Sequence, residues 1–455
     1  MTSLALALAV ATGCCLLSPV FPPGRSRPAW LGWLLLFCAG APAGIGLESM
    51  VYFLLTWAGA ASAALLWGAS IALLAAGAVI ARRYAPAGEA IEVPANQNRH
   101  LWWMALVAAA GLSLAAVSVA RTASGAPHGD WDAWAMWNLR AKYLAGPDQS
   151  WRNSVSRDLQ SWPDYPLLIP ASVARLWRMA GEISTTGPQA LSLLYTTCAV
   201  GLVFGLLAMA RGWTAAVLSM LPMAASANFW SQASAQYSDI PLSAYMAGAL
   251  GLALLRQDRA SLMAAGLLAS MAAWTKNEGA VYCALLLAAV FYFRGKDRAR
   301  PMLIGALPGL LVVAAFKLML APRSSLLADP IASLPGKLFD PSRWMTIFSL
   351  VADEIVNMGI GVGHPLLILA ALILAFGMRK DSDWRFPTTL LALQIGAYLG
   401  VYLITPSDVR WHVGSSFGRL LGQVWPSILL TVFLAMQVQM GSALAGPASK
   451  SRSVR

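Results

Sequence analysis

Charged side chains are scarce in this sequence, and their scarcity excludes a soluble globular protein. Only 11% of the 455 residues are charged and 58% are hydrophobic, whereas soluble domains carry about 25% charged residues. The apolar residues gather in runs of about 17–25, the length at which a helix crosses the hydrocarbon layer of a membrane. The runs are continuous rather than alternating, which favours helices over barrel strands. The sequence therefore predicts an all-α fold, a polytopic transmembrane helical bundle.

Cysteine pairs and the common catalytic motifs are also missing. The five cysteines lie inside apolar runs and none has CxxC spacing, which indicates small buried side chains rather than disulfides or a metal site. The sequence contains no P-loop, GxGxxG, HExxH or GxSxG motif, so the usual nucleotide, zinc and hydrolase signatures do not apply. We predict no cofactor and no metal. Closely spaced acids could hold a divalent ion, but no ligand spacing requires one.

The N-terminus lacks the basic segment of a signal peptide, so we interpret it as a retained membrane span. Thirteen candidate spans follow from the apolar runs. The third is long, which indicates either a strong tilt or a break near Gly59, and the eighth and ninth form either a pair that barely crosses or a re-entrant hairpin. The thirteen spans are 2–20, 29–46, 51–81, 101–120, 188–210, 213–229, 240–255, 260–275, 280–293, 302–321, 361–378, 387–404 and 424–440. The sequence thus predicts one transmembrane domain, 1–440, and a basic cytoplasmic tail, 441–455.

The basic residues are concentrated on one of the two sides that thirteen spans define. With the N-terminus outside, the inside segments carry an excess of twelve basic residues, which equals the net charge of +12 of the whole chain. The positive-inside rule therefore predicts that the N-terminus is outside and the C-terminus inside. This explanation of the basic charge leaves no reason to expect a nucleic-acid partner.

Three long loops then lie outside, at 121–187, 322–360 and 405–423, and we expect interfacial helices in them. The first contains "GDWDAWAMWNLRAKYL". A helix that begins at Asp132 places four apolar residues on one stripe, namely Trp134, Trp137, Ala141 and Leu144. Arg140 then faces elsewhere. An ordinary interfacial helix with Asp132 as its N-cap is the plain alternative. It leaves Asp130 and the Asp164–Tyr165 pair unexplained.

Polar residues recur at two later positions on the same side. In "QYSDIPLSAYM", Asp239 stands at the mouth of the seventh span and is either a helix cap or a second wall of one cavity. In "WTKNEG", Lys276 and Glu278 lie between two apolar spans, where charges are costly unless they are paired or functional. The alternative is a solvated turn with a lysine that reaches the membrane surface.

The last polar segment, "TPSDVRWHVGSSFGRLLGQVWP", precedes the final span. His412 and Arg419 are two helical turns apart, so a helix places them on one face with Ser415 and Ser416 between them. Such a face suits the oxygens of a phosphate. Scattered polar groups on an interfacial helix remain the alternative.

These four segments, in this order, resemble the GT-C superfamily of integral-membrane glycosyltransferases. The similarity is to bacterial relatives of protein mannosyltransferases and lipid A aminoarabinose transferases, and covers residues 120–426. It rests on an acidic first outside loop, a later acidic turn, a "TKxEG"-like turn and a "DxRWHxxxSxxR"-like loop. This chain differs from the best-known members in having four spans rather than one before the acidic loop, and in lacking a large C-terminal periplasmic domain.

The resemblance implies transfer of a sugar from a polyprenyl-phosphate donor to an acceptor hydroxyl on an envelope glycan, lipid or protein. It places the chain in a bacterial cytoplasmic (inner) membrane with its site facing the periplasm or exterior. Asp132 is the leading candidate for the acceptor base, Asp130 the alternative, and Asp239 a second acid. The implied substrate-binding residues are Lys276, Glu278, Arg410, His412, Arg419, Trp131, Trp134 and Tyr165.

Two other classes of function fit the composition. A secondary transporter or lipid flippase would place charges at mid-membrane in broken helices, but nearly all acids of this chain lie toward one face. Lys317 is an exception, within a span near its outer end. A non-catalytic membrane scaffold would use the outside loops to bind a partner.

Overall fold

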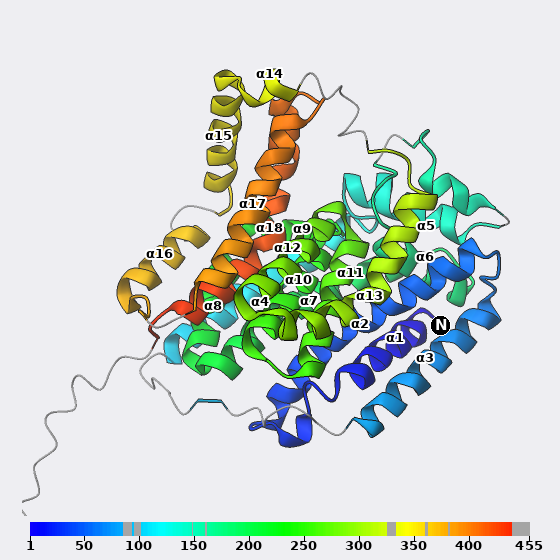
Figure 1. Cartoon of the computed structure of the whole chain (residues 1–455), viewed down its shortest axis with the longest axis horizontal. Helices are drawn as coiled ribbons and strands as arrows, with labels where there is room; N and C mark the ends of the chain where they lie inside the picture. The colour runs from blue at the N-terminus through cyan, green and yellow to red at the C-terminus, as the bar shows by residue number, and fades with distance from the viewer. Residues whose placement is uncertain are drawn as a thin grey trace, which may run out of the picture.

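The computed structural model describes residues 1–84, 93–94, 102–147, 149–159, 162–324, 334–359, 363–380 and 383–438, and within these it is all-helical (Figure 1). The long helices of the first half are α1 (Thr2–Leu17), α2 (Ala29–Trp57), α3 (Ala63–Arg83), α4 (Trp102–Gly125), α7 (Thr186–Arg211), α8 (Trp213–Ala225) and α10 (Asp239–Leu255). Those of the second half are α11 (Arg259–Thr275), α12 (Asn277–Arg294), α13 (Lys296–Met319), α16 (Pro365–Phe376), α17 (Arg385–Ile404) and α18 (Val409–Ala435).

Each of the thirteen predicted spans overlaps one of these helices over its described residues. Residues 101, 361–362 and 439–440 of those spans, and the predicted tail 441–455, lie outside the described residues. In the described residues, seven helices are long and apolar enough to cross a membrane, or eight if the bent pair α9–α10 forms one span. Several predicted boundaries differ from those of the helices, most of all at two places. The second span continues to Trp57, with the break at residues 58–62, where Gly59 adopts a positive φ of 73°. The final span begins before residue 424, because Asp408 caps a helix that starts at Val409.

Helix α10 forms the centre of the bundle. Its residues from Asp239 to Ala253 are all buried, and it packs against α7, α11 and α18. A helix that is apolar on all sides is stable only when other helices surround it. The N-terminus of this central helix, which carries Asp239, lies beside the start of α12 and the middle of α18, where Lys276 and Gln423 bond to Asp239. We call this the site end of the bundle.

Helices α1 and α2 approach each other more closely than side chains would allow. A Cβ atom at Gly44 would lie 1.8 Å from the carbonyl oxygen of Ala9, and one at Gly13 would lie 1.8 Å from that of Gly40. Small residues four apart are typical of helix contacts within a membrane, where close backbone packing replaces the hydrophobic effect. The pair α1–α2, together with α3, forms the blue side of the molecule in Figure 1.

Further helices lie in the described segments between the thirteen long ones. The first loop contains η3 (Ala133–Trp137), α5 (Asn138–Ala145), η4 (Ser150–Val155) and α6 (Leu168–Ala180); α9 (Ala227–Ser234) precedes α10, and α14 (Leu334–Leu338) and α15 (Pro341–Val356) precede α16. Helix α15 packs on α18, and with α14 it projects beyond most of the bundle (Figure 1). Its exposed face carries Met345 and Phe348.

Candidate functional site

A π-helical turn positions the acidic stretch of the first loop. The chain forms a π-turn over Ala133–Trp137 before α5 begins, so the predicted regular helix is wrong in its first turn. Because a π-turn is wider than an α-helical turn, it changes the direction in which the side chains before and after it point. Trp137, Ala141 and Leu144 of the predicted stripe are buried within the protein, whereas Trp134 is 48% exposed.

Arg140 is fully buried, contrary to the expected outward direction. Its Nε donates to the carbonyl of Ser154 (2.8 Å) and its Nη2 to the carbonyls of Pro163 (3.2 Å) and Tyr165 (2.8 Å). One guanidinium therefore closes the loop from 138 to 165 by satisfying three backbone acceptors. This places Tyr165 at the site.

Asp132 is paired with Arg419 rather than serving as a cap. It precedes the π-turn without a side-chain capping bond, and its Oδ2 accepts from Nη1 of Arg419. The guanidinium carbon of Arg419 lies 5.4 Å from the centre of the Tyr237 ring. The two paired side chains keep 20% and 25% of their surface exposed, so a carboxylate and a cation are both held in place and reachable.

Asp130 occupies a different environment from Asp132. It is exposed, and its Oδ1 accepts from the N–H of Trp131 at 2.7 Å. Its own N–H donates to the carbonyl of Ala235 at 3.1 Å, which ties the loop to the turn before α10. Asp130 thus supports the loop, while Asp132 faces the arginine.

Asp239 and Lys276 form a buried ion pair. Nζ of Lys276 lies 2.9 Å from Oδ1 of Asp239, and the two residues are 5% and 0% exposed. Nε2 of Gln423 donates to the same oxygen at 2.5 Å. Among the described atoms Oδ2 of Asp239 has no partner. Asp239 lies in the first turn of α10 and makes no side-chain capping bond, so the capping alternative is wrong.

Glu278 connects this pair to the first loop. Its Oε1 lies 3.4 Å from Nζ of Lys276 and accepts from the hydroxyl of Tyr165 at 3.4 Å. Nζ of Lys276 also lies 5.6 Å from the centre of the Tyr165 ring. Burial, with the charge of Glu278 second, raises the pKa of Tyr165 well above its ordinary value, so this side chain remains a neutral hydroxyl. We call Asp132, Asp239, Lys276, Glu278 and Arg419 the charged cluster.

His412 lies outside the charged cluster, in an aromatic setting. Its ring is stacked with Trp162 (centroids 6.4 Å apart) and edge-on to Tyr402 (5.0 Å). Nδ1 lies 3.0 Å from the hydroxyl of Thr405. Ser416 donates to the carbonyl of His412, so that hydroxyl is used within the helix. The predicted face from His412 to Arg419 is helical, but only Arg419 enters the ion pairs.

Three predicted residues remain, and all three are exposed at the surface of the protein. Trp131 and Trp134 are 62% and 48% exposed and stand edge to face, with ring centres 4.6 Å apart. Such rings can stack on a sugar or an isoprenoid. Arg410 is exposed at the start of α18.

The sequence alone singles out Asp164 and Lys317 but gives them no role at the site, and sequence reasoning missed Tyr398 and Gln423. Nδ2 of Asn277 donates to Oδ2 of Asp164 at 2.9 Å, and Lys317 donates to the carbonyl of Asp164. The hydroxyl of Tyr398 donates to Oε1 of Gln423 at 2.7 Å. A glutamine within an apolar run is the sequence signal that points to such a residue, because hydrocarbon offers it no partner.

The described residues offer no evident metal site. They contain no group of three or more His, Cys, Asp or Glu side chains that could hold an ion. Asp132 and Asp239 are each paired with a cation rather than with each other. Comparison of the chain with protein-family models, with curated proteins and with solved structures gives no match.

Proposed function

We propose that this chain is an integral-membrane glycosyltransferase of the GT-C type, which moves a sugar from a polyprenyl-phosphate donor to an acceptor hydroxyl at the outer face of a bacterial cytoplasmic membrane. In this proposal all thirteen long helices cross or enter the membrane, the N-terminus is outside, and the site end faces the periplasm or exterior. The observation that carries the proposal is the charged cluster, which joins acids and cations from four separated segments at one end of an apolar bundle.

The cluster suits the two requirements of such a transfer. An acceptor hydroxyl needs a carboxylate base within hydrogen-bond reach, and Asp132 is the partly exposed acid. A leaving phosphate develops negative charge and needs cationic donors, which Arg419 and Lys276 supply. Direct displacement with inversion needs one base on the acceptor side, unlike hydrolysis by paired carboxylates.

The remaining residues take supporting roles in this proposal. Asp239 and Glu278 hold Lys276 in place and accept from sugar hydroxyls, Asp239 through its unpaired oxygen. Tyr165, Trp131 and Trp134 contact the sugar or the isoprenoid. His412 and Arg410 lie farther out and bind the outer part of the donor or acceptor.

Transfer in proteoliposomes tests the proposal. Purified protein is incubated with radiolabelled polyprenyl-phosphate sugars and with glycan, lipid and protein fractions of a bacterial envelope. We expect label to move into one of these fractions. The proposal fails if every donor remains intact with every fraction while the protein is folded.

One observation favours transport as a second candidate. Glu48 of α2 and Arg175 of α6 form a buried ion pair, Nε to Oε2 3.1 Å, with Ser70 of α3 bonded to both. Charges within a membrane often mark transport pathways. Arg175 also donates to the carbonyl of Ala5 in α1, so this pair joins four helices, as a structural staple would. Substrate-driven uptake into protein-containing vesicles, lost in Glu48→Gln, would support transport instead.

A further inference from the structure

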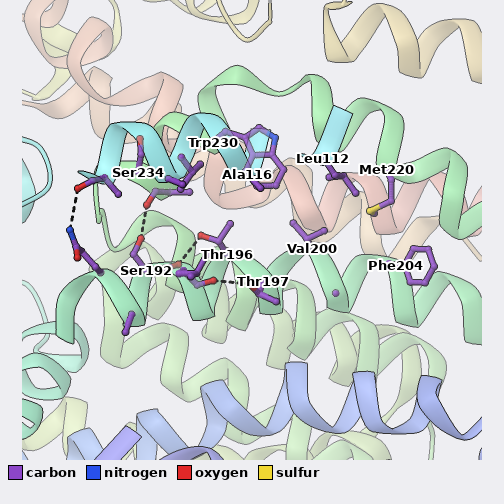
Figure 2. Close-up of a pocket in the computed structure, with 18 of the residues that line it drawn as sticks. Leu112, Ala116, Ser192, Thr196, Thr197, Val200, Phe204, Met220, Trp230 and Ser234 are labelled. Carbon is purple, nitrogen blue, oxygen red and sulfur yellow. Dashed lines mark hydrogen bonds between the residues drawn. The ribbon is translucent and has the colours of Figure 1, made fainter. Parts of the chain in front are cut away.

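A groove of about 870 Å³ runs between α4 and α7, with residues of α8 and α9 completing its wall (Figure 2). Along α7 the lining extends from Thr186, near the site end, to Phe204. These residues are about 27 Å apart at 1.5 Å per helical residue, close to the ~30 Å of a hydrocarbon layer. The groove is therefore long enough to hold one hydrocarbon chain across the thickness of a membrane.

The wall of the groove is suited to hydrocarbon. The hydroxyls of Ser192, Thr196 and Thr197 point toward it in Figure 2, but each donates to a backbone carbonyl, at 2.6, 2.7 and 2.9 Å. They offer no free donor to a ligand. Helix α4 forms the opposite wall, and only 6% of its most apolar segment is buried inside the molecule. The groove therefore borders the surface that a membrane would cover.

The site end of the groove presents a hydrogen-bond acceptor and no charge. No Lys, Arg, His, Asp or Glu is among the described residues that line it. Gln236 lines it and is 7% exposed; its Nε2 donates to the carbonyl of Pro127 at 3.0 Å, while its Oε1 has no partner among described atoms. Its φ of 59° is costly for a residue with a side chain. A buried acceptor without a partner is costly, so a ligand hydroxyl or amide would fit there.

The groove ends beside the charged cluster. Ala235, the neighbour of Gln236, accepts from the N–H of Asp130. The next residue, Tyr237, has its ring beside Arg419, which pairs with Asp132. A lipid in the groove would thus carry its headgroup next to the proposed acceptor base.

We propose that the acceptor is itself a membrane lipid, whose chain lies in the α4–α7 groove and whose neutral headgroup carries a hydroxyl. This inference rests on the proposed transfer reaction. No cation among the described residues lines the groove, and the two cations beside its end, Arg419 and Lys276, are already paired with acids. The donor phosphate would occupy these cations, which leaves none for a phosphate on the acceptor headgroup. The lipid oxygen bonds to the anomeric carbon, the bond from that carbon to the phosphate oxygen breaks with its electron pair on the phosphate, and the hydroxyl proton passes to Asp132.

Photo-crosslinking in nanodiscs tests the groove. The probes are a diacylglycerol with a diazirine in its chain and the matching phosphatidic acid. We expect the diacylglycerol to label peptides of α4 and α7. Ala116→Trp and Val200→Trp fill the groove and should reduce this labelling at least about tenfold. Leu114→Trp is the matched control, because Leu114 of α4 is 72% exposed and does not line the groove. Gln236→Met should reduce labelling about fivefold, the effect of one hydrogen bond.

Three results would overturn the inference: undiminished labelling in the groove-filling variants, labelling by phosphatidic acid as strong as that by diacylglycerol, or undiminished transfer to lipid in Ala116→Trp. Leu114→Trp should keep both slow hydrolysis of donor by water and transfer to lipid. Thermal unfolding of both variants should match that of the wild type, which shows that they are folded. Labelling needs no turnover. Specific labelling without any donor turnover would therefore count against the glycosyltransferase, and not against the lipid groove.

Discussion

At the scale of single residues, the molecule holds its charges by pairing them. Asp239 and Lys276 are both removed from solvent, and each has further partners, Gln423 for the acid and Glu278 for the lysine. A buried charge is tolerated when it is paired and hydrogen-bonded, and is strongly destabilising when its partner is removed. The site therefore combines chemical reactivity with a requirement for charge balance.

This balance predicts different effects on stability and on activity. Asp239→Asn or Lys276→Met alone leaves one buried charge and should cost about 3–5 kcal/mol. The triple variant Asp239→Asn/Lys276→Met/Glu278→Gln removes the lysine together with both of its acidic partners, and should recover most of that stability but no activity. Thermal unfolding in detergent and the transfer assay measure the two effects. A triple variant that is as unstable as the single ones would contradict the pairing argument.

The pairing also predicts that chelators do not inhibit. Asp132 and Asp239 are each bound to a cation, and no described cluster could hold a metal. Transfer should keep its full rate, within about twofold, after EDTA treatment. Loss of activity in EDTA that is restored by Mg²⁺ or Mn²⁺ would show that a metal acts where we place Arg419 and Lys276.

At the scale of helices, the sequence predicted the position of each long helix but not every boundary. Continuous apolar runs place the helices because hydrocarbon leaves the backbone no other way to satisfy its amides. Glu48 falls between two predicted spans, but it lies inside α2, where Arg175 pairs with its charge and Ser70 donates a hydrogen bond to it. A pairing between distant segments cannot be derived from one run of residues. For the same reason, the partners of Asp132 and Asp239 emerged only with the fold.

The close contact of α1 and α2 predicts a severe effect of a small substitution. Gly44→Val places methyl groups against the backbone of Ala9, and overpacking of this kind costs about 1–3 kcal/mol. The apparent melting temperature in detergent should fall. Gly414→Ala, at a glycine of α18 with open space around it, is the control and should change it little. Equal effects of the two would argue against the close contact.

Helix α15 predicts a pH dependence. Burial, with Asp353 second, raises the pKa of Glu354 above its ordinary value. The charged form is thus disfavoured in the docked state, so docking of α15 on α18 is strongest at low pH and weakens as pH rises through the raised pKa. The distribution of distances between spin labels at Met345 and Trp411 should broaden as the pH is raised from the acid side of the ordinary glutamate pKa to above the raised pKa of Glu354. Glu354→Gln should abolish the change, and a change that persists in it would assign the effect elsewhere.

At the scale of the whole molecule, the basic residues and the site lie at opposite ends of the proposed topology. Single cysteines at Lys296 and at Ser407, in a chain whose five native cysteines are replaced, should report opposite sides. We expect a membrane-impermeant maleimide added to intact cells to label position 407 and not position 296. Labelling of position 296 alone would reverse the orientation and remove access to a donor on the outer face.

The transfer rate of Asp132→Asn in proteoliposomes tests the central claim most directly. With a radiolabelled polyprenyl-phosphate sugar and its acceptor, the rate should fall at least about 10²-fold, as expected on loss of a general base. Asp130→Asn, two residues away and exposed, should stay within about threefold of the wild type. If Asp132→Asn transfers sugar at the full rate, Asp132 is not the base; if both variants do, the catalytic assignment of this loop is wrong.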